Sequence, residues 1–301
     1  MDDAAQVTFG LLGVPSSAGS HNAGQDKAPE AWRSAGLPER LSAAGLQVRD
    51  FGDLPVRRHR PAARVDGVRD LDRVLEVARQ TADRVDTIVG AGCVALVVGG
   101  DCTITLGVLA GLSRHAGVGL VYFDGDVDLN LPESSGSGVL DTMGMTHALG
   151  GGKPELSSLG QQWPMLADDH VVLFGFDPAE LDTGQWTELA SRHLYAAPAP
   201  AVRADPAGEA QRARAYLGRR SDSYLVHFDV DVLHTGLFPL ANFPHFAGLT
   251  LDEVSVCLNE FAGGERFGGL VITEVNPDHD PSGELLRTLL ARVVRALAPA
   301  R

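Results

Sequence analysis

The chain has 301 residues, of which 44% are hydrophobic, 21% charged and 6% aromatic, a composition that indicates a globular protein with an aliphatic core and excludes a disordered or fibrous one. Its formal net charge is -14, from 39 acidic and 25 basic residues. Such a surface repels phosphate backbones and anionic lipids, so we expect no nucleic-acid or membrane partner, whereas a small cationic substrate is easily accommodated.

In chain order, short β-rich segments alternate with longer segments of helical periodicity. The eight expected strands are residues 7–14, 47–51, 94–98, 119–123, 170–175, 193–196, 224–228 and 269–275. The spacing of apolar residues predicts helices at residues 71–89, 103–114, 208–217 and 283–297. Residues 196–206, which are rich in Ala and Pro, are interpreted as a loop between a strand and a helix.

Several of these strands, such as VALVV and GLVYF, are apolar on both faces. Helices that cover both sides of a parallel sheet produce this pattern. We therefore expect an α/β fold, a three-layer sandwich around a mainly parallel sheet of about eight strands. Residues 1–301 are expected to form a single domain.

Cysteine usage bears on the cellular compartment. Cys93, Cys102 and Cys257 are too few and too scattered for a disulfide framework, and the chain start lacks the basic then apolar pattern of a signal peptide. No apolar run approaches the ~18 residues that a membrane-spanning helix needs. A cytoplasmic location is the expectation.

Acidic residues directly follow three of the apolar strands. GGDC ends one strand at residues 99–102, DGDVD ends the next at 124–128, and DVD ends a later one at 229–231. Because the carboxyl ends of parallel strands form the crevice in which an open α/β sheet binds ligands, we expect these acids to converge.

Converging carboxylates repel one another and stay ionised only beside a cation. Oxygen-rich ligand sets suit Mn²⁺, Mg²⁺ or Ca²⁺, and bridging carboxylates are compatible with two ions. A lone Asp after a strand more often caps the next helix. The alternate acids Asp124, Asp126 and Asp128, followed by another Asp-X-Asp at a strand end, favour a metal site over capping.

The motifs resemble those of the ureohydrolase family, which includes arginase, agmatinase and formimidoylglutamase. The resemblance covers nearly the whole chain, through LLGVPSSAGSHNAGQDKAPEAWR, VVGGDCTITLG, YFDGDVDLN, GFDPAE, VHFDVDV and ITEVNPDHD. In that family two Mn²⁺ ions activate a water that attacks the guanidinium carbon. The resemblance implies a hydrolase of linear amidines, with an arginine-, agmatine- or modified-guanidine-like substrate, and a homo-oligomer, commonly a trimer or hexamer.

The resemblance also implies roles for individual residues. Glu274 matches the carboxylate that orients the guanidinium group, whose paired donors suit it. Asn130 and Ser137 fall where arginases address a substrate carboxylate, and Asp177 and Glu180 fall where they address an ammonium group. The positions that match metal ligands are Asp124, Asp128, Asp229 and Asp231.

Three positions depart from the family pattern, and each replaces a histidine. Cys102 and Asp126 stand where the family has metal-binding histidines, and Asp141 stands where arginases have a histidine thought to shuttle protons. Five Asp ligands and a thiolate would place a charge of -6 against +4 from two ions, and this excess makes an activated water less acidic.

Several outcomes stay open at this point. Cys102 either binds metal or remains a thiol beside a single ion, and a protonated Asp126 or Asp141 serves as a proton donor in the catalytic hypothesis. The unusual ligands point to a modified guanidine, such as an N-hydroxylated one, as substrate. The alternative is a non-catalytic paralogue that binds metal or a guanidino ligand in a regulatory or structural role.

Four histidines are candidate substitutes for the missing ones and are left unassigned. They are His147, His227, His234 and His245. His227 precedes Asp229 and Asp231 by even steps on a strand, so it shares a face with both.

Overall fold

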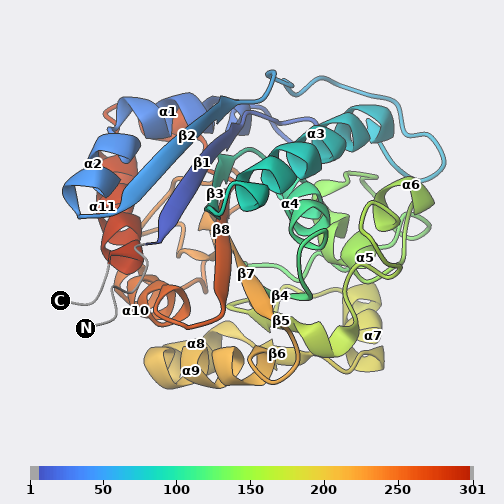
Figure 1. The fold of residues 1–301 in the computed structure, drawn as a ribbon. Helices are drawn as coiled ribbons and strands as arrows, with labels where there is room; N and C mark the ends of the chain where they lie inside the picture. Colours follow the sequence, from blue (N-terminus) through green and yellow to red (C-terminus); the bar gives the residue numbers. More distant parts are fainter. Residues whose placement is uncertain (1–6, 299–301) are drawn as a thin grey trace.

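The computed structural model describes residues 7–298, so the first six and last three residues of the expected domain lie outside it. Its centre is an eight-stranded sheet with the order β2-β1-β3-β8-β7-β4-β5-β6, and neighbouring strands pair in parallel (Figure 1). The strands are β1 Thr8–Val14, β2 Gln47–Asp53, β3 Val94–Gly99, β4 Val118–Phe123, β5 Val171–Phe174, β6 Tyr195–Ala197, β7 Ser223–Asp229 and β8 Phe267–Thr273.

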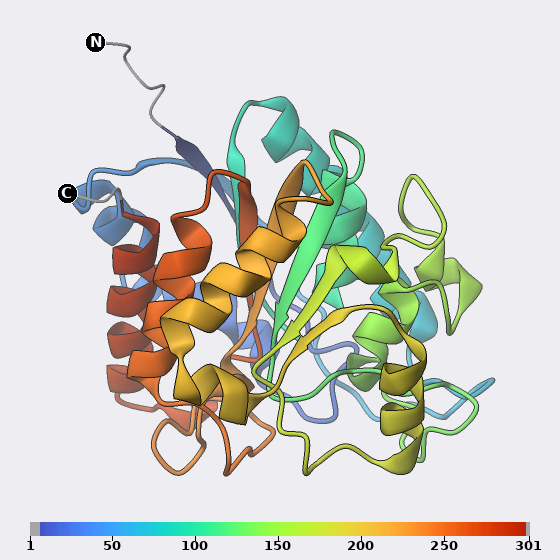
Figure 2. The same ribbon diagram turned by 90° about the horizontal axis from the view of Figure 1, so that it is seen from below.

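Helices cover both faces of this sheet, which therefore lies between two helical layers (Figure 2). One layer contains α1 Ala28–Ser34, α2 Leu37–Ala43, α8 Ala199–Ala204, α9 Pro206–Leu217, α10 Leu251–Ala262 and α11 Glu284–Leu297. The other contains α3 Leu71–Gly90, α4 Ile104–Leu112, α5 Gly144–Ala148, α6 Pro154–Ser157 and α7 Thr183–Ser191. Short 3₁₀ segments are η1 Gln25–Lys27, η2 Asp141–Met143, η3 Asp168–His170, η4 Val230–Val232 and η5 Pro277–His279.

The apolar strands bury both of their faces. In β3, Leu96 and Val98 join the core under α1 and α11, whereas Ala95 and Val97 join the core under α3 and α4. Because successive side chains of a strand point to opposite faces, a continuous apolar run is what a doubly covered strand requires. The expected α/β three-layer sandwich is confirmed, and every pairing in the sheet is parallel.

Helix α4, which follows β3, lies unusually close to α3. A side chain at Gly107 would meet the Ala78 carbonyl oxygen at 2.5 Å, and one at Gly111 would meet the Ala82 carbonyl oxygen at 2.7 Å. The two glycines thus allow the helix backbones to approach, and every residue of α4 is buried. This packing fixes the segment that carries Cys102.

The interpretation of residues 196–206 as a loop is wrong. These residues complete β6 and form α8, with Pro198 as the N-cap and Pro200 in the first turn. Proline is tolerated there because the N–H groups of the first turn need no partner within the helix, and the surrounding alanines favour helix. Six further helices of the described residues were not predicted, namely α1, α2, α5, α6, α7 and α10.

Two further expectations concern the whole fold. The three cysteines are free and buried, as their scattered positions suggested. Within residues 7–298, none of the helices combines the length and the apolar character that crossing a bilayer requires.

Candidate metal centre

The four central strands deliver their carboxyl ends to one cavity. Cys102 lies just after β3, Glu274 directly after β8, Asp229 at the end of β7 and Asp124 directly after β4. Seven carboxylates line this cavity, namely Asp124, Asp126, Asp128, Asp141, Asp229, Asp231 and Glu274. Among the described residues, no Lys or Arg lines it.

The acidic loop after β4 is held by its own hydrogen bonds. Asp124 Oδ1 accepts the backbone N–H of Asp126 at 2.7 Å, and Asp126 Oδ1 accepts the side-chain amide of Gln185 at 3.0 Å. Asp128 adopts a positive φ of 48°, and its Oδ2 accepts the hydroxyl of Tyr122. These contacts fix the direction of each carboxylate.

A similar arrangement holds the acids after β7. Asp229 Oδ1 accepts the backbone N–H of Asp231 at 2.8 Å, and its Oδ2 accepts the Thr273 hydroxyl at 3.2 Å and the Cys102 thiol at 2.6 Å. Asp231 Oδ1 accepts the backbone N–H of Gly125 at 3.1 Å, which ties this segment to the loop after β4.

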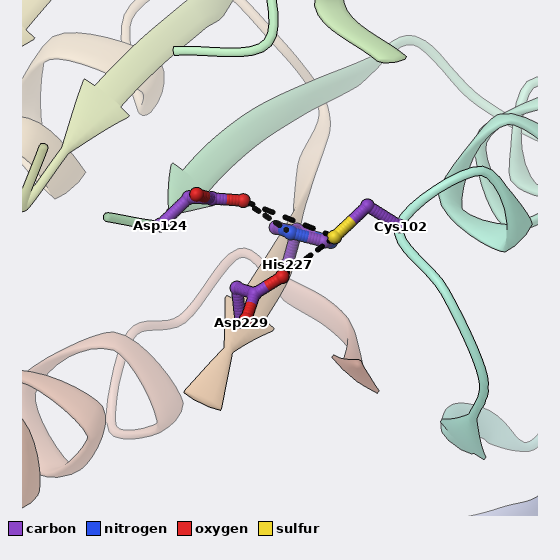
Figure 3. A group of neighbouring side chains, drawn as sticks. All are labelled: Cys102, Asp124, His227 and Asp229. Atoms are coloured by element: carbon purple, nitrogen blue, oxygen red, sulfur yellow. Dashed lines mark hydrogen bonds and ion pairs between the residues drawn. The ribbon is translucent and has the colours of Figure 1, made fainter. Parts of the chain in front are cut away.

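Four side chains form the tightest group in the cavity region. One ligand atom from each of Cys102, Asp124, His227 and Asp229 lies within 4.8 Å of the others, and the side chains point toward one another (Figure 3). His227 Nε2 lies 3.2 Å from Asp124 Oδ2, and its ring stacks on Tyr122 with centroids 4.1 Å apart. The sequence pattern left His227 unassigned, although its even spacing from Asp229 was the available signal.

The electrostatics of the cavity call for a cation. Burial raises the pKa of the Asp124 and Asp229 carboxyls well above the usual range, and repulsion from Asp231 raises both further. Burial likewise raises the pKa of the Cys102 thiol, and the charge of Asp229 adds to this effect. Because seven carboxylates line the cavity without a Lys or Arg in the described lining, they fit bound divalent ions, which would neutralise the excess negative charge.

Glu274 is presented in a constrained conformation. Its φ of 62° is left-handed, its backbone N–H donates to Gly100 O at 3.0 Å, and its Oε2 accepts the Gln25 amide at 2.8 Å. The other oxygen, Oε1, is buried and has no hydrogen-bond partner among residues 7–298. A non-glycine residue held in this region is a feature that clusters at functional sites.

Asp141 lies beside Cys102 and Glu274, and one ligand atom of each lies within 4.8 Å of the others. Its Oδ1 accepts the backbone N–H of Cys102 at 2.8 Å. Burial raises the pKa of its carboxyl well above the ordinary range, and the charge of Asp101 raises it further. The carboxyl is therefore protonated more readily than an exposed one.

A second histidine that the sequence left unassigned borders the cavity. His245 Nδ1 lies 2.6 Å from Glu180 Oε2, and its Nε2 lies 3.6 Å from Asp231 Oδ2. Burial alone would lower the pKa of His245, but Asp231 and Glu180 reverse this and raise it to about 10. The His245 imidazolium is thus already the ion-pair partner of Glu180, one of the acids predicted to bind substrate.

The other predicted substrate-binding residues lie outside the cavity lining. Ser137 Oγ lies 3.3 Å from Ser135 Oγ, and Asp177 Oδ1 accepts the Ala179 N–H at 2.9 Å. Asn130 is half-buried and bonds Thr142 and Thr146 through its backbone. Of the described residues that line the cavity, none is Asn130, Ser137, Asp177 or Glu180.

The fold and the site define an α/β protein with an acidic cleft at the carboxyl edge of a parallel sheet. Comparison with known proteins gives the family: the arginase family matches residues 7–298, and the chain belongs to it. It is 31% identical to an arginase of Bacillus caldovelox over 271 residues, which cover 89% of this chain and 90% of the relative. It is 28% identical to human arginase-1 over 298 residues, covering 97% and 92% respectively.

Solved structures agree with this assignment. The arginase of Bacillus caldovelox superposes with a TM-score of 0.90 at 29% identity, covering 98% of this chain and 99% of the other. A formimidoylglutamase of Bacillus subtilis, at 16% identity, superposes with a TM-score of 0.77, covering 100% of this chain and 90% of the other, and shares the fold. The ureohydrolase resemblance of the motifs is therefore confirmed.

Proposed function

We propose that the chain is a metal-dependent hydrolase that cleaves a C–N bond in a linear guanidino or amidine compound. The observation that carries the proposal is the meeting of seven carboxylates, with no Lys or Arg in the described lining, at the ends of the four central strands. Membership of the arginase family supports the same chemistry. Metal binding and turnover are the properties to be tested.

The residues proposed to hold the ions are those at the strand ends. They are Cys102, Asp124, Asp126, Asp128, Asp229 and Asp231. The bound cations, two Mn²⁺ in this proposal, would supply Lewis-acid activation of a water. A single ion or another divalent metal is distinguished by metal analysis of the loaded protein.

Glu274 is proposed to orient the substrate cation. Its free Oε1 lies in the cavity lining and matches the paired N–H donors of a guanidinium group, while Gln25 holds the other oxygen. Asp141 and Asp126 are proposed proton carriers, because burial raises the pKa of both carboxyls and a protonated acid can donate to a leaving amine.

The remainder of the substrate is a finer proposal. Asn130 and Ser137 would address a carboxylate, and Asp177 and Glu180 an ammonium group, as the family resemblance implies. The ion pair between Glu180 and His245 competes with the binding of an ammonium group by Glu180. Comparing arginine with agmatine, which lacks the carboxylate, measures what this region contributes.

The decisive experiment is release of the amine product across a panel of guanidino compounds by the metal-loaded protein, with urea, or hydroxyurea from an N-hydroxylated guanidine, as the co-product. The panel contains arginine, agmatine and an N-hydroxylated guanidine, and we expect the modified guanidine to turn over fastest. Glu274→Gln removes one partner of a buried ion pair, worth ~3 kcal/mol, so turnover should fall about 100-fold with the metal content unchanged.

A bound metal without hydrolysis of any compound would contradict the catalytic proposal and favour a regulatory or structural binding role.

The remaining proposals are one domain over residues 1–301, a homo-oligomer that is a trimer or hexamer, and a cytoplasmic location. Light scattering on the purified full chain measures the subunit count.

A further inference from the structure

We propose that His227 and Cys102, together with Asp124 and Asp229, form a site of mixed nitrogen, sulfur and oxygen donors for one divalent ion. Such a donor set selects Zn²⁺, or Co²⁺ as its spectroscopic substitute, more strongly than an all-oxygen site does. This inference rests on the proposed metal-dependent function. It adds a ligand, His227, that the motifs did not predict.

The geometry of the four side chains is close to that of an occupied site. The donor atoms come from the loop after β3, the end of β4 and two positions of β7, and all lie within 4.8 Å of one another. Ligand atoms of a tetrahedral Zn²⁺ site are about 3.3–3.8 Å apart, from bonds of ~2.0–2.3 Å. His227 Nε2 and Asp124 Oδ2 lie 3.2 Å apart, and Cys102 Sγ and Asp124 Oδ2 lie 4.0 Å apart.

One pair must move for an ion to enter. Cys102 Sγ lies 2.6 Å from Asp229 Oδ2, because the thiol donates its proton to that carboxylate. Loss of this proton on metal binding removes the hydrogen bond, and the two atoms then need to separate by about 1 Å. All four side chains are buried, so the ion would be enclosed.

The imidazole of His227 is already oriented for this role. Its Nδ1 lies 2.8 Å from the hydroxyl of Thr105 on α4, which can accept the Nδ1 proton and leave the Nε2 lone pair directed at the cluster. The same hydroxyl can instead donate to Nδ1, so that Nε2–H bonds Asp124 when no ion is bound. The stack on Tyr122 holds the ring plane in both states.

No other imidazole among the described residues joins this cluster. The positions where the family pattern places histidines carry Cys102 and Asp126, and His245 is paired with Glu180. His227 on β7 is therefore the residue that can supply a nitrogen ligand to this site. Thiolate and imidazole donors favour Zn²⁺, whereas carboxylates alone favour Mn²⁺.

The test is X-ray absorption of the full chain loaded with one equivalent of Zn²⁺. We expect one sulfur scatterer at about 2.3 Å and an imidazole contribution. Co²⁺ loading should give a sulfur-to-metal absorption band in the near ultraviolet. Cys102→Ser should abolish the sulfur signal, and His227→Asn the imidazole signal.

Matched controls separate ligation from general damage. Cys257→Ser and His147→Asn also alter a buried thiol and a buried imidazole, but neither residue belongs to the cluster, so both signals should persist. Zn²⁺ binds more tightly than Mn²⁺ at most sites, so the comparison is the ratio of the two affinities. This ratio should fall about 100-fold in Cys102→Ser and stay unchanged in Cys257→Ser.

The wild-type spectrum decides the matter even if a variant fails to fold. A shell of oxygen atoms alone would overturn the inference and leave metal-dependent hydrolysis standing. An imidazole signal that persists in a folded His227→Asn protein would overturn the assignment of His227. A chain that binds no divalent ion would overturn both this inference and the proposed function.

Discussion

Two acidic regions of the molecule are built on opposite principles. At the outer strand β2, Arg33 donates to Asp53 Oδ1 from Nε at 2.9 Å and to Asp50 Oδ1 from a terminal nitrogen at 3.0 Å. At the central strands, the carboxylates of the cleft meet without an Arg or Lys in the described lining. Arg33 neutralises the outer acids, whereas the cleft holds more carboxylates than its neighbouring histidines can neutralise.

The pKa values of the two regions move in opposite directions. Partial burial alone would raise the pKa of Asp50, but the hydrogen bonds and charge of Arg33 lower it below the ordinary value of 3.8. Burial raises the pKa of Asp229, and the charge of Asp231 raises it further. Ionisation of Asp50 therefore stabilises the fold and ionisation of Asp229 destabilises it, whereas Asp231, whose pKa burial alone would raise but His245 lowers, behaves like the outer acid.

The largest effect is expected from Asp229→Asn, compared with Asp50→Asn as its matched control. Asp229 belongs to the tight ligand group, so its loss should weaken divalent-ion binding by about 100-fold or more and abolish turnover. Without metal, the free energy of unfolding should rise at neutral pH, because a buried charge is removed. Isothermal titration with Mn²⁺ and Zn²⁺ and denaturant unfolding measure both effects.

Asp50→Asn should change the free energy of unfolding in the opposite direction. It leaves ion binding unchanged and lowers the free energy of unfolding, because Arg33 loses one of its carboxylate partners. Equal ion affinities in wild type and Asp229→Asn would remove the distinction between the two regions.

An effect of intermediate size is expected from pH and metal removal together. Raised pKa values mean that the cleft carboxyls bind more protons in the folded than in the unfolded chain at pH values above about 4. These carboxyls outnumber His227, whose pKa burial lowers to about 3 and which opposes the trend. The free energy of unfolding of the metal-free protein should therefore decrease as pH rises above about 4, through the raised pKa values. Divalent ions should remove this decrease, because they replace the protons.

Thermal unfolding between pH 4 and 8, with a chelator and with added metal, tests this expectation. Asp229→Asn should flatten the metal-free profile. A metal-free protein whose stability increases with pH throughout this range would contradict the proposed charge imbalance.

The smallest effect is expected from Arg33→Ala. Its partly exposed ion pairs contribute roughly 1 kcal/mol, so the melting temperature should fall by about 2 °C. The stability conferred by the low pKa of Asp50 is present above its ordinary pKa and lost as pH falls through the folded value, and the variant should lose that acid-limb dependence. Ion affinity measured in parallel should not change, and a changed affinity would mean that the two regions communicate.

Local patterns predicted much of this fold. All eight strands were found, and the central ones were found because doubly covered strands require continuous apolar runs, whereas the outer strand β2 is mostly exposed. Helices α3 and α11 were found because their periodicity extends over several turns. Helices α1, α2 and α8 are too short for that signal and depend on packing against the sheet, which a local pattern does not contain.

The sequence alone determined that acids follow the apolar strands and that these strands lie in parallel, and hence at which edge the acids stand. Tertiary structure alone decided which side chains meet there. Gln25 bonds Glu274 across 249 positions, and Cys102 bonds Asp229 across 127. Strand order and side-chain direction bring such distant residues together, and neither is encoded in the spacing of neighbouring residues.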